Sequence, residues 1–534
     1  MERMDRLLES YLDLERHLTP AGRAGDGADG GGAAHGAAGE RHQLGRFDAD
    51  SMRQHLAAFR AVASAVEELD VDDVQDEIDR TALLDRIRTT IARFEHERPQ
   101  ARDPGFWIEH VADGLTTLLL DADPAGPDPA RAVVAVSGII GDVPAFLDAA
   151  RATLQRPPAI LTDRALLLLG ATGALLVHVA AVLGTHAPGG PEVMEAATGA
   201  ALEALRKFGT ALRGEIEPDA NPHAAALGRE RFELRLHHEH AIGTGAGGLW
   251  RGALAARAEL DGALTAAAGE VAAGRDWREV VARLRSEHVA DRVAALREAV
   301  DRARHFAAGR ALVPVIDAPL EISATPAVLE PLLPEVFYRG SGDPAHLLVG
   351  APLARAEVAA VAARAGVPGR HEHAAAQRAA DSAVRRALDG VAARKGWSLY
   401  AEQMMGGAGF YATPEERLLA LARQLDAVVS LAIDVSFHAR EMAPADAAAL
   451  ATEWAGWPRA RAERAVRRAA ARPTELLAAE AGRRELVRLR TAAGVSEPDE
   501  SSATPSELYR FHGAVLARGG LPPGLTGWSM GLGE

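Results

Sequence analysis

Apolar residues recur at helical spacing along almost the whole chain. Between Asp48 and Phe94 they return every three or four positions, and aspartates at 70, 72 and 73 mark the start of the second of two helices. The same period predicts helices over residues 1–18, 48–69, 71–94, 105–120, 128–154, 163–184, 190–213, 224–239, 245–271 and 276–308, again with breaks from 354 to about 493, and last near 505–518. The tail after that is predicted to be irregular.

Two segments depart from this pattern. Residues 20–45 are rich in glycine and alanine, which predicts a flexible loop. Residues 311–350 contain β-branched runs broken by prolines and glycines, which predicts a small sheet. We therefore expect a mostly α fold: an N-terminal helix (1–19), the loop (20–45), and one large helical domain (46–534) with a central cleft and a small sheet near 311–350.

One stretch is apolar enough to be weighed as a membrane span. Ala165–Gly184 holds twenty residues without a charge. Asp163 and Arg164 stand at its start, His178 interrupts it, and glycines would weaken an isolated helix. We expect a core helix buried on all sides. Because the N-terminus reads as a charged amphipathic helix rather than a signal peptide, we expect a cytoplasmic protein.

Composition narrows the class of partner. The chain of 534 residues has a net charge of −15, which argues against nucleic acid and against an anionic membrane surface as partners. It has no cysteine, so disulfides and cysteine-ligated metals are excluded. Lys207 and Lys395 are its only lysines, a bias typical of GC-rich, actinobacterial genomes. We expect a small-molecule partner and leave a homodimer open.

Few short motifs carry chemistry by themselves. The chain has neither a phosphate-binding glycine loop nor the Gly-x-Ser-x-Gly turn of serine hydrolases. His237, His238 and His240 form a cluster in RLHHEHAIG, but neighbouring residues on a helix point in different directions. We interpret this run as a partly exposed polar turn rather than a metal site.

Several spaced segments form an ordered series. These are EIDRTALLDRIRTTI at 77–91, ALGRERFELRLHHEH at 226–240, PGRHEHAAAQ at 368–377, KGWSLYAEQ at 395–403 and FHGAVLARGGLPPGL at 511–525. The series resembles the bacterial domain-of-unknown-function 885 family over nearly the whole chain. The resemblance implies a large, mostly helical fold of the zinc-dependent peptidase type.

The metal motif that the resemblance implies is not kept. The family pattern is approximately His-Glu-x-x-Pro-Gly-His-His, followed by Glu-Gly-Trp-x-x-Tyr-x-Glu. Its first histidine, its base glutamate, its histidine pair and its second-motif glutamate fall on Arg364, Ala365, Arg370, His371 and Lys395. Arginine and protonated lysine cannot ligate zinc. We therefore expect no metal and no other cofactor.

Framework positions of the same motifs persist. Trp397, Tyr400 and Glu402 keep their places, as do His438 and His512. We expect Trp397, Tyr400 and His438 to share one pocket. A further family segment, Pro-Gly-Gln-x-x-x-Tyr, falls on Pro473, Thr474, Glu475 and Ala479 and loses its glutamine and tyrosine.

Three cations at the positions of a metal centre could bind a carboxylate or stabilise an oxyanion. The first hypothesis is thus a metal-independent enzyme acting on a small carboxylate or peptide-like metabolite, in specialised metabolism, by acid/base or electrostatic catalysis. Its catalytic candidates are Lys395, His371, Tyr400, Glu402 and His438, and its substrate-binding candidates are Arg364, Arg370 and Trp397. Glu402 lies two helical turns after Lys395 on the same helix face and is the candidate for the partner of that lysine or for the acceptor of its proton.

Two alternatives stay open. A non-catalytic pseudo-peptidase would bind a ligand or act as a scaffold, and acids such as Glu372 and Glu402 would then simply pair with the new cations. A metallohydrolase with rebuilt ligands is the other alternative. An open cleft with convergent polar groups favours the enzyme, and a filled one favours the scaffold.

Overall fold

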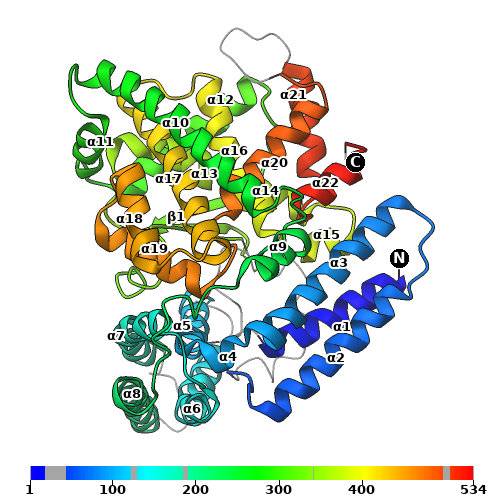
Figure 1. The fold of residues 1–534 in the computed structure, drawn as a ribbon, viewed down its shortest axis with the longest axis vertical. Coiled ribbons are helices and arrows are strands. Elements are labelled where there is room, and N and C mark those ends of the chain that lie inside the picture. Colours follow the sequence, from blue (N-terminus) through cyan, green and yellow to red (C-terminus); the bar gives the residue numbers. More distant parts are fainter. Residues whose placement is uncertain are drawn as a thin grey trace. The chain divides into compact units, whose positions relative to one another are not determined.

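The computed structural model describes residues 2–18, 44–121, 129–183, 191–340, 342–496 and 505–532. Helices dominate these residues (Figure 1), and a single small sheet lies within 320–349, so the predicted mostly α fold is confirmed. Residues 20–43 of the predicted flexible loop lie outside the described ranges. Contacts divide the chain into two compact units.

The first unit comprises Met1–Asp70, Ile87–Ala225 and Pro326–Pro334. Asp48 caps its second helix by accepting hydrogen bonds from the backbone N–H groups of Asp50 and Ser51, the usual solution for unpaired donors at a helix start. Phe47 packs edge-on against Trp107, with ring centroids 5.6 Å apart. The helices are α1 (Glu2–Leu18), α2 (Ala49–Glu67), a π-helix (Arg93–Glu97), α4 (Pro99–Arg102), α5 (Pro104–Asp121), α6 (Pro129–Thr153), α7 (Ala159–Leu183) and α8 (Pro191–Gly214).

Helix α7 corrects one expectation. Within the described residues it is the helix long and apolar enough to cross a membrane, yet only 28% of its most apolar 18-residue window is buried. It packs against α5, α6 and α8 with one face, on which Leu175 and Val179 are fully buried. On the other face Leu167 is 63% exposed. Burial on all sides was therefore wrong, because the helix is apolar around its circumference but its unit covers only one side.

The second unit comprises Val71–Arg86, Ala226–Thr325 and Glu335–Glu534, and α3 (Val74–Ala92) contributes residues to both units. The predicted helix over 276–308 is in fact two helices, and Asp291 caps the second. A short helix also forms in the tail that was predicted to be irregular. Besides α3, the helices of the second unit are α9 (Arg229–His238), α10 (Ala246–Val271), α11 (Trp277–Ser286), α12 (Arg292–Gly309), η3 (Arg355–Glu357), α13 (Val358–Ala365), α14 (Arg370–Arg378), α15 (Ala383–Ala387), α16 (Val391–Gly407), α17 (Pro414–Ala439), α18 (Pro444–Ala455), α19 (Arg459–Ala471), α20 (Ala478–Ala492), α21 (Pro505–Leu516) and α22 (Pro523–Ser529).

The sheet of this unit has three strands, β1 (Leu320–Ala324), β2 (Val336–Arg339) and β3 (Ala345–Val349). Strand β3 lies in the middle, parallel to β1 and antiparallel to β2. Leu347 and Val349 of β3 are fully buried in a cluster that includes Leu296 of α12 and Val361 of α13. Burial of these apolar side chains holds α13, and with it Arg364, against the sheet.

Helices α16 and α20 touch at their backbones. A Cβ on Gly396 would lie 2.6 Å from the carbonyl carbon of Gly482, and one on Gly482 would lie 2.1 Å from the Ala392 oxygen. Only glycine permits so close an approach. The contact brings Lys395, the neighbour of Gly396, to the loop that precedes α20.

Candidate functional site

Lys395 belongs to a group of charged side chains from three segments. Its Nζ is 2.8 Å from Oε1 of Glu475 in the loop before α20. The same carboxylate accepts a 2.6 Å hydrogen bond from Arg468 of α19 and lies 3.8 Å from Arg472. We call Lys395, Arg468, Arg472 and Glu475 the cationic cluster. Three cationic side chains thus converge on one carboxylate.

Electrostatics keeps this cluster charged. Burial by itself raises the pKa of Glu475, but attraction to Arg468, Lys395 and Arg472 outweighs it and holds that pKa well below its ordinary value. The side chains of Lys395, Arg468 and Arg472 are 19%, 41% and 28% exposed. All three cationic side chains are therefore partly exposed.

The loop that carries Glu475 is held in an unusual conformation. Thr474 has a φ of 67°, a region that β-branched residues rarely enter. The buried carboxyl of Asp434, on α17, accepts hydrogen bonds from the N–H groups of Thr474 (3.2 Å) and Leu477 (3.1 Å). Burial raises the pKa of Asp434 to about 7. Asp434 thus holds the strained loop that places Glu475 against Lys395.

His240 interacts electrostatically with Lys395 of the cationic cluster, and the sequence analysis did not identify it as a site residue. It is fully buried, so the expectation of a partly exposed turn was wrong at this position. Its ring lies close to the Thr474 backbone, but neither ring nitrogen makes a hydrogen bond of normal geometry. Burial lowers its pKa, Glu239 opposes that effect, and Arg235 and Lys395 add to it, so the imidazole is neutral near pH 7.

Arg364 and Glu402 form a second charged group. Oε2 of Glu402 lies 3.2 Å from Nη1 of Arg364, and Oε1 accepts a 2.8 Å hydrogen bond from Nε of Arg423 on α17. The expectation that Glu402 partners Lys395 was wrong. Two helical turns separate the two residues by about 10 Å along the axis, and a different carboxylate lies nearer to each cation.

Arg370 and His371 pack against the sheet. The guanidinium of Arg370 lies 5.3 Å from the ring centre of Tyr338 on β2. Nδ1 of His371 lies 3.1 Å from the Tyr338 hydroxyl, and its Nε2 lies 3.1 Å from the Ala318 carbonyl oxygen. Burial lowers the pKa of His371 to about 4. Both nitrogens of this neutral ring are therefore engaged in binding the sheet region.

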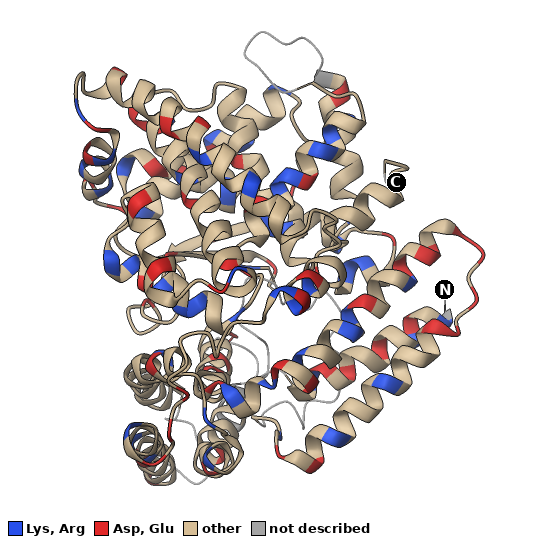
Figure 2. Cartoon of the chain, in the orientation of Figure 1, with Lys and Arg blue, Asp and Glu red and all other residues tan. Residues whose placement is uncertain are grey.

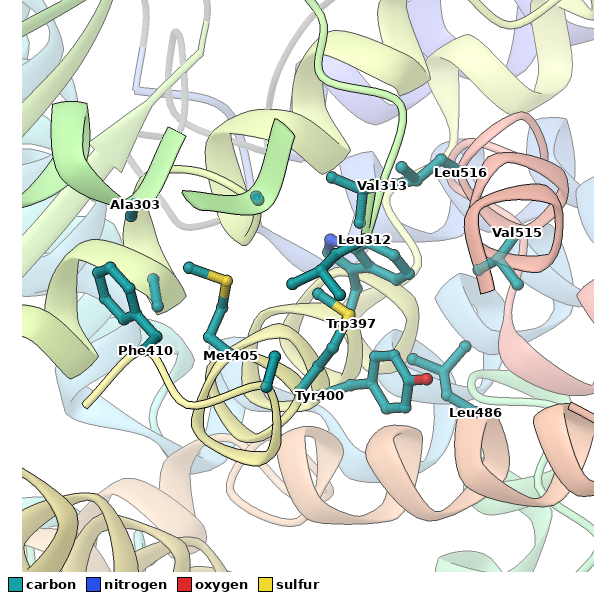
Figure 3. Packing of buried hydrophobic residues seen from close by; sticks show 14 of the residues in the cluster. Ala303, Leu312, Val313, Trp397, Tyr400, Met405, Phe410, Leu486, Val515 and Leu516 are labelled. Carbon is teal, nitrogen blue, oxygen red and sulfur yellow. The ribbon is translucent and has the colours of Figure 1, made fainter. Parts of the chain in front are cut away.

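Trp397 and Tyr400 lie inside a hydrophobic cluster (Figure 3). Nε1 of Trp397 donates a 2.9 Å hydrogen bond to the Pro368 carbonyl oxygen, and the Tyr400 hydroxyl lies 2.9 Å from Nε2 of His512. The first contact joins the two motifs that the resemblance singled out, and the second joins Tyr400 to the later segment that contains His512. Both aromatic side chains are at most 2% exposed.

His438 belongs to a different network. Its Nε2 lies 2.9 Å from the Ala469 carbonyl oxygen, and its Nδ1 accepts a 3.2 Å hydrogen bond from the Leu227 N–H. Its ring stacks on Phe232 of α9. The single pocket expected for Trp397, Tyr400 and His438 is therefore not formed as predicted: the first two share a cluster, and His438 packs elsewhere.

The residues at the expected metal positions do not fit a zinc ion. Arg364 is paired with a carboxylate, Arg370 stacks on an aromatic ring, and Lys395 is paired with Glu475. Each is a cation without a lone pair to donate, and His371 uses both of its nitrogens. Among the described residues, no three histidine or acidic side chains are grouped so that they could hold a metal.

Figure 2 shows basic and acidic residues on most of the helices, with neither sign confined to one part of the chain. The convergence of cations on Glu475 is thus a local feature of an acidic chain. The sequence could have pointed to it, since Lys395 and Glu475 both depart from the family pattern in charge. The central cleft expected around these residues stays a prediction.

Comparisons with known proteins identify the family. No curated protein matches the chain. A solved structure from Shewanella oneidensis, described as a candidate lipoprotein of unknown function, superimposes with a TM-score of 0.74 at 18% identity and covers 99% of this chain and 98% of its own. A candidate lipoprotein from Colwellia psychrerythraea gives 0.70 at 16% identity, covering 99% of both chains. The family model described as "Bacterial protein of unknown function (DUF885)" matches residues 31–526, so the chain belongs to this family.

Proposed function

We propose that this chain is a metal-independent, non-hydrolytic binding protein for small carboxylates, a pseudo-peptidase in the terms of the resemblance. The observation that carries the proposal is the convergence of Lys395, Arg468 and Arg472 on Glu475, at a position where the resemblance implies a metal-binding glutamate. Fixed cations recognise an anion where a divalent ion would otherwise do so.

The chemistry of the cluster favours binding. Pairing with Glu475 favours the ammonium form of Lys395, which attracts a carboxylate but cannot act as a base or nucleophile. Arginine presents a planar fork that matches a carboxylate with two hydrogen bonds. An incoming carboxylate would share Lys395 and Arg468 with Glu475.

The candidates for proton transfer also favour binding over catalysis. His371 and His438 each use both ring nitrogens in contacts with the protein, and Glu402 is paired with two arginines. Each of these side chains is at most 1% exposed. A buried group that is hydrogen-bonded in place cannot readily reach a substrate.

Calorimetry tests the proposal. Succinate, citrate and an acidic dipeptide would be titrated into the protein at constant ionic strength, with the neutral diamide of succinate as control. We expect at least one carboxylate to bind, Lys395→Met to weaken binding by about tenfold or more, and Lys207→Met to leave it unchanged. Equal binding by Lys395→Met, or zinc-dependent hydrolysis of peptides by the wild type, would contradict the proposal.

A second candidate is a metal-independent enzyme acting on the same carboxylate, and His240 is the observation that favours it. The charge of Lys395 helps to lower the pKa of this neutral, buried imidazole, and hydrogen bonds of normal geometry do not fix its nitrogens. It would serve as the general base, while the cations stabilise negative charge. If the protein is an enzyme, His240→Gln should abolish product formation and retain the affinity for the carboxylate. If it is a binding protein, neither the wild type nor His240→Gln should form product.

We propose a cytoplasmic location and a role in specialised metabolism from composition. The two similar structures are described as candidate lipoproteins, so a membrane-associated location is the alternative. Cell fractionation distinguishes the two, because a cytoplasmic protein stays in the supernatant after membranes are sedimented.

A further inference from the structure

Helix α7 carries an apolar stripe that its own unit does not cover. Leu167 and Val177 are 63% and 47% exposed, and the small residues between them are exposed as well. The stripe runs through Leu167, Gly170, Ala174, Val177 and Ala181, with Asp163 and His178 at its borders. Its spacing alternates between three and four residues, which is the seam along which two helices pack.

We propose that this stripe is a homodimer interface, in which α7 of one copy packs antiparallel against α7 of a second copy. An antiparallel pair about a two-fold axis near Thr172 aligns Leu167 with the partner's Val177 and Gly170 with the partner's Ala174. Large residues thus meet at both ends and small residues meet in the middle. A Cβ on Gly170 would meet nothing within 4 Å, so the middle of the stripe is open to close approach.

Charge complementarity favours the same orientation. In the antiparallel register Asp163 lies about one helical turn, roughly 5 Å along the axis, from the partner's His178. Its carboxylate can then accept a hydrogen bond from that imidazole at each end of the interface. In a parallel pair Asp163 would face its own counterpart, which is unfavourable.

The area of the stripe sets the strength of the dimer. A helix of 25 residues is about 37 Å long and about 10 Å wide. One helix from each copy therefore buries roughly 700 Å² in total, which is below the ~1,200 Å² of a stable complex. The dimer is accordingly weak and reversible, with half-association at micromolar concentrations or above.

A lipid surface fits the stripe less well. Helices that lie on membranes carry Lys or Arg beside their apolar face, which attract anionic headgroups. The exposed charged residue bordering this stripe is Asp163, and no Lys or Arg occurs between Ala165 and Leu183.

Sedimentation velocity from about 1 µM to about 200 µM tests the interface. The wild type is expected to shift from 56.2 kDa toward twice that mass as concentration rises. Leu167→Glu should stay monomeric throughout, and Leu254→Glu, at another exposed leucine (41%) on α10, should behave as wild type. A wild type that is monomeric at the highest concentration would overturn the proposal, as would an unchanged dimer of Leu167→Glu.

Cross-linking tests the orientation, since the chain has no cysteine of its own. The double variant Leu167→Cys/Val177→Cys should form a disulfide-linked dimer on mild oxidation, and each single variant should not. Efficient cross-linking of single Leu167→Cys would show a parallel pair. Binding of the monomer to vesicles of phosphatidylcholine and phosphatidylglycerol, weakened by Leu167→Glu, would show a lipid occupant; either result would overturn the proposal.

Discussion

Lys395 and Glu475, eighty residues apart in sequence, form a 2.8 Å ion pair across the contact between α16 and the loop before α20. In the family pattern that the chain resembles, these two positions hold a glutamate and a glutamine. The exchange to lysine and glutamate is complementary in charge, and the close approach of Gly396 to Gly482 brings the two side chains within reach. We therefore propose that the pair belongs to a rebuilt site rather than to one cation left by drift.

Glu475 should be the most sensitive member of the cluster. Glu475→Gln leaves Lys395, Arg468 and Arg472 together without the carboxylate on which they converge, so we expect the free energy of unfolding to fall by about 2–4 kcal/mol. Lys395→Met should cost less, about 1 kcal/mol, because Arg468 and Arg472 still pair with Glu475. Urea denaturation measures both.

The control for this prediction is Glu203→Gln on α8, which removes the carboxylate of an exposed Glu–Arg pair. Exposed pairs contribute little, so no change beyond error is expected. If Glu475→Gln were as harmless as this control, the cluster would not be an electrostatic unit.

The loop conformation at Thr474 predicts an unusual order of stability. Thr474→Gly and Thr474→Ala lose the same hydroxyl contacts, but only glycine adopts a φ of 67° without strain. We expect the glycine variant to be more stable than the alanine variant by about 1 kcal/mol, the reverse of the order within a helix. Thermal melting compares them, and a more stable alanine variant would show that the loop is not strained.

The contact between α16 and α20 predicts intolerance of a single methyl group. Gly396→Ala would place Cβ within 2.6 Å of the Gly482 backbone, so the helices must separate, at a cost of about 3 kcal/mol or more. Gly262→Ala on α10 meets nothing within 4 Å and should stabilise by about 0.5–1 kcal/mol. Equal melting temperatures of the two variants would contradict the observed packing.

Four buried histidines predict loss of stability in acid. Burial lowers the pKa of His371 and His512 to about 4 and that of His373 and His438 to about 3. Because these folded-state values lie below the ordinary 6.5, their contribution is present above pH 6.5 and is lost as pH falls toward 4.

Three acids oppose this trend. Burial raises the pKa of Asp434 and Glu372 to about 7 and that of Asp103 to about 6, so their contribution is present at low pH and is lost as pH rises through these values. Near pH 5.5 the unfolded chain still binds about one more proton than the folded chain, and stability should fall by about 1–2 kcal/mol per pH unit of acidification. Urea midpoints at pH 6.5 and 5.5 measure this, and a midpoint that is equal or higher at pH 5.5 would contradict it.

The helical framework could be predicted from sequence because a period of 3.6 residues needs no knowledge of neighbours. Residues 1–18 and 245–271 correspond closely to α1 and α10. Periodicity could not show the break at Asp291, since apolar residues continue on both sides of it. Nor could it show that α7 is covered on one face only, which depends on the position of other helices.

The site was predictable only in part. Lys395 stood out because it departs from the motif around it, but its partner depends on the contact of two glycines far apart in sequence. Glu402 follows Lys395 on the same helix face, yet its carboxylate forms ion pairs with Arg364 and Arg423. Local spacing therefore identified the helix face, and tertiary packing decided the ion pairs.

Selective observation of the two lysines tests the central claim most directly. Protein labelled with carbon-13 at the lysine ε position should give two signals, one from Lys395 and one from Lys207 on α8, and Lys207→Arg assigns them. Titration with the carboxylate that binds in calorimetry, in metal-free buffer, is expected to move the Lys395 signal in a saturable way and to leave that of Lys207 in place. A Lys395 signal that does not move at saturating ligand, or moves only after zinc is added, would contradict a metal-independent carboxylate site at the cationic cluster.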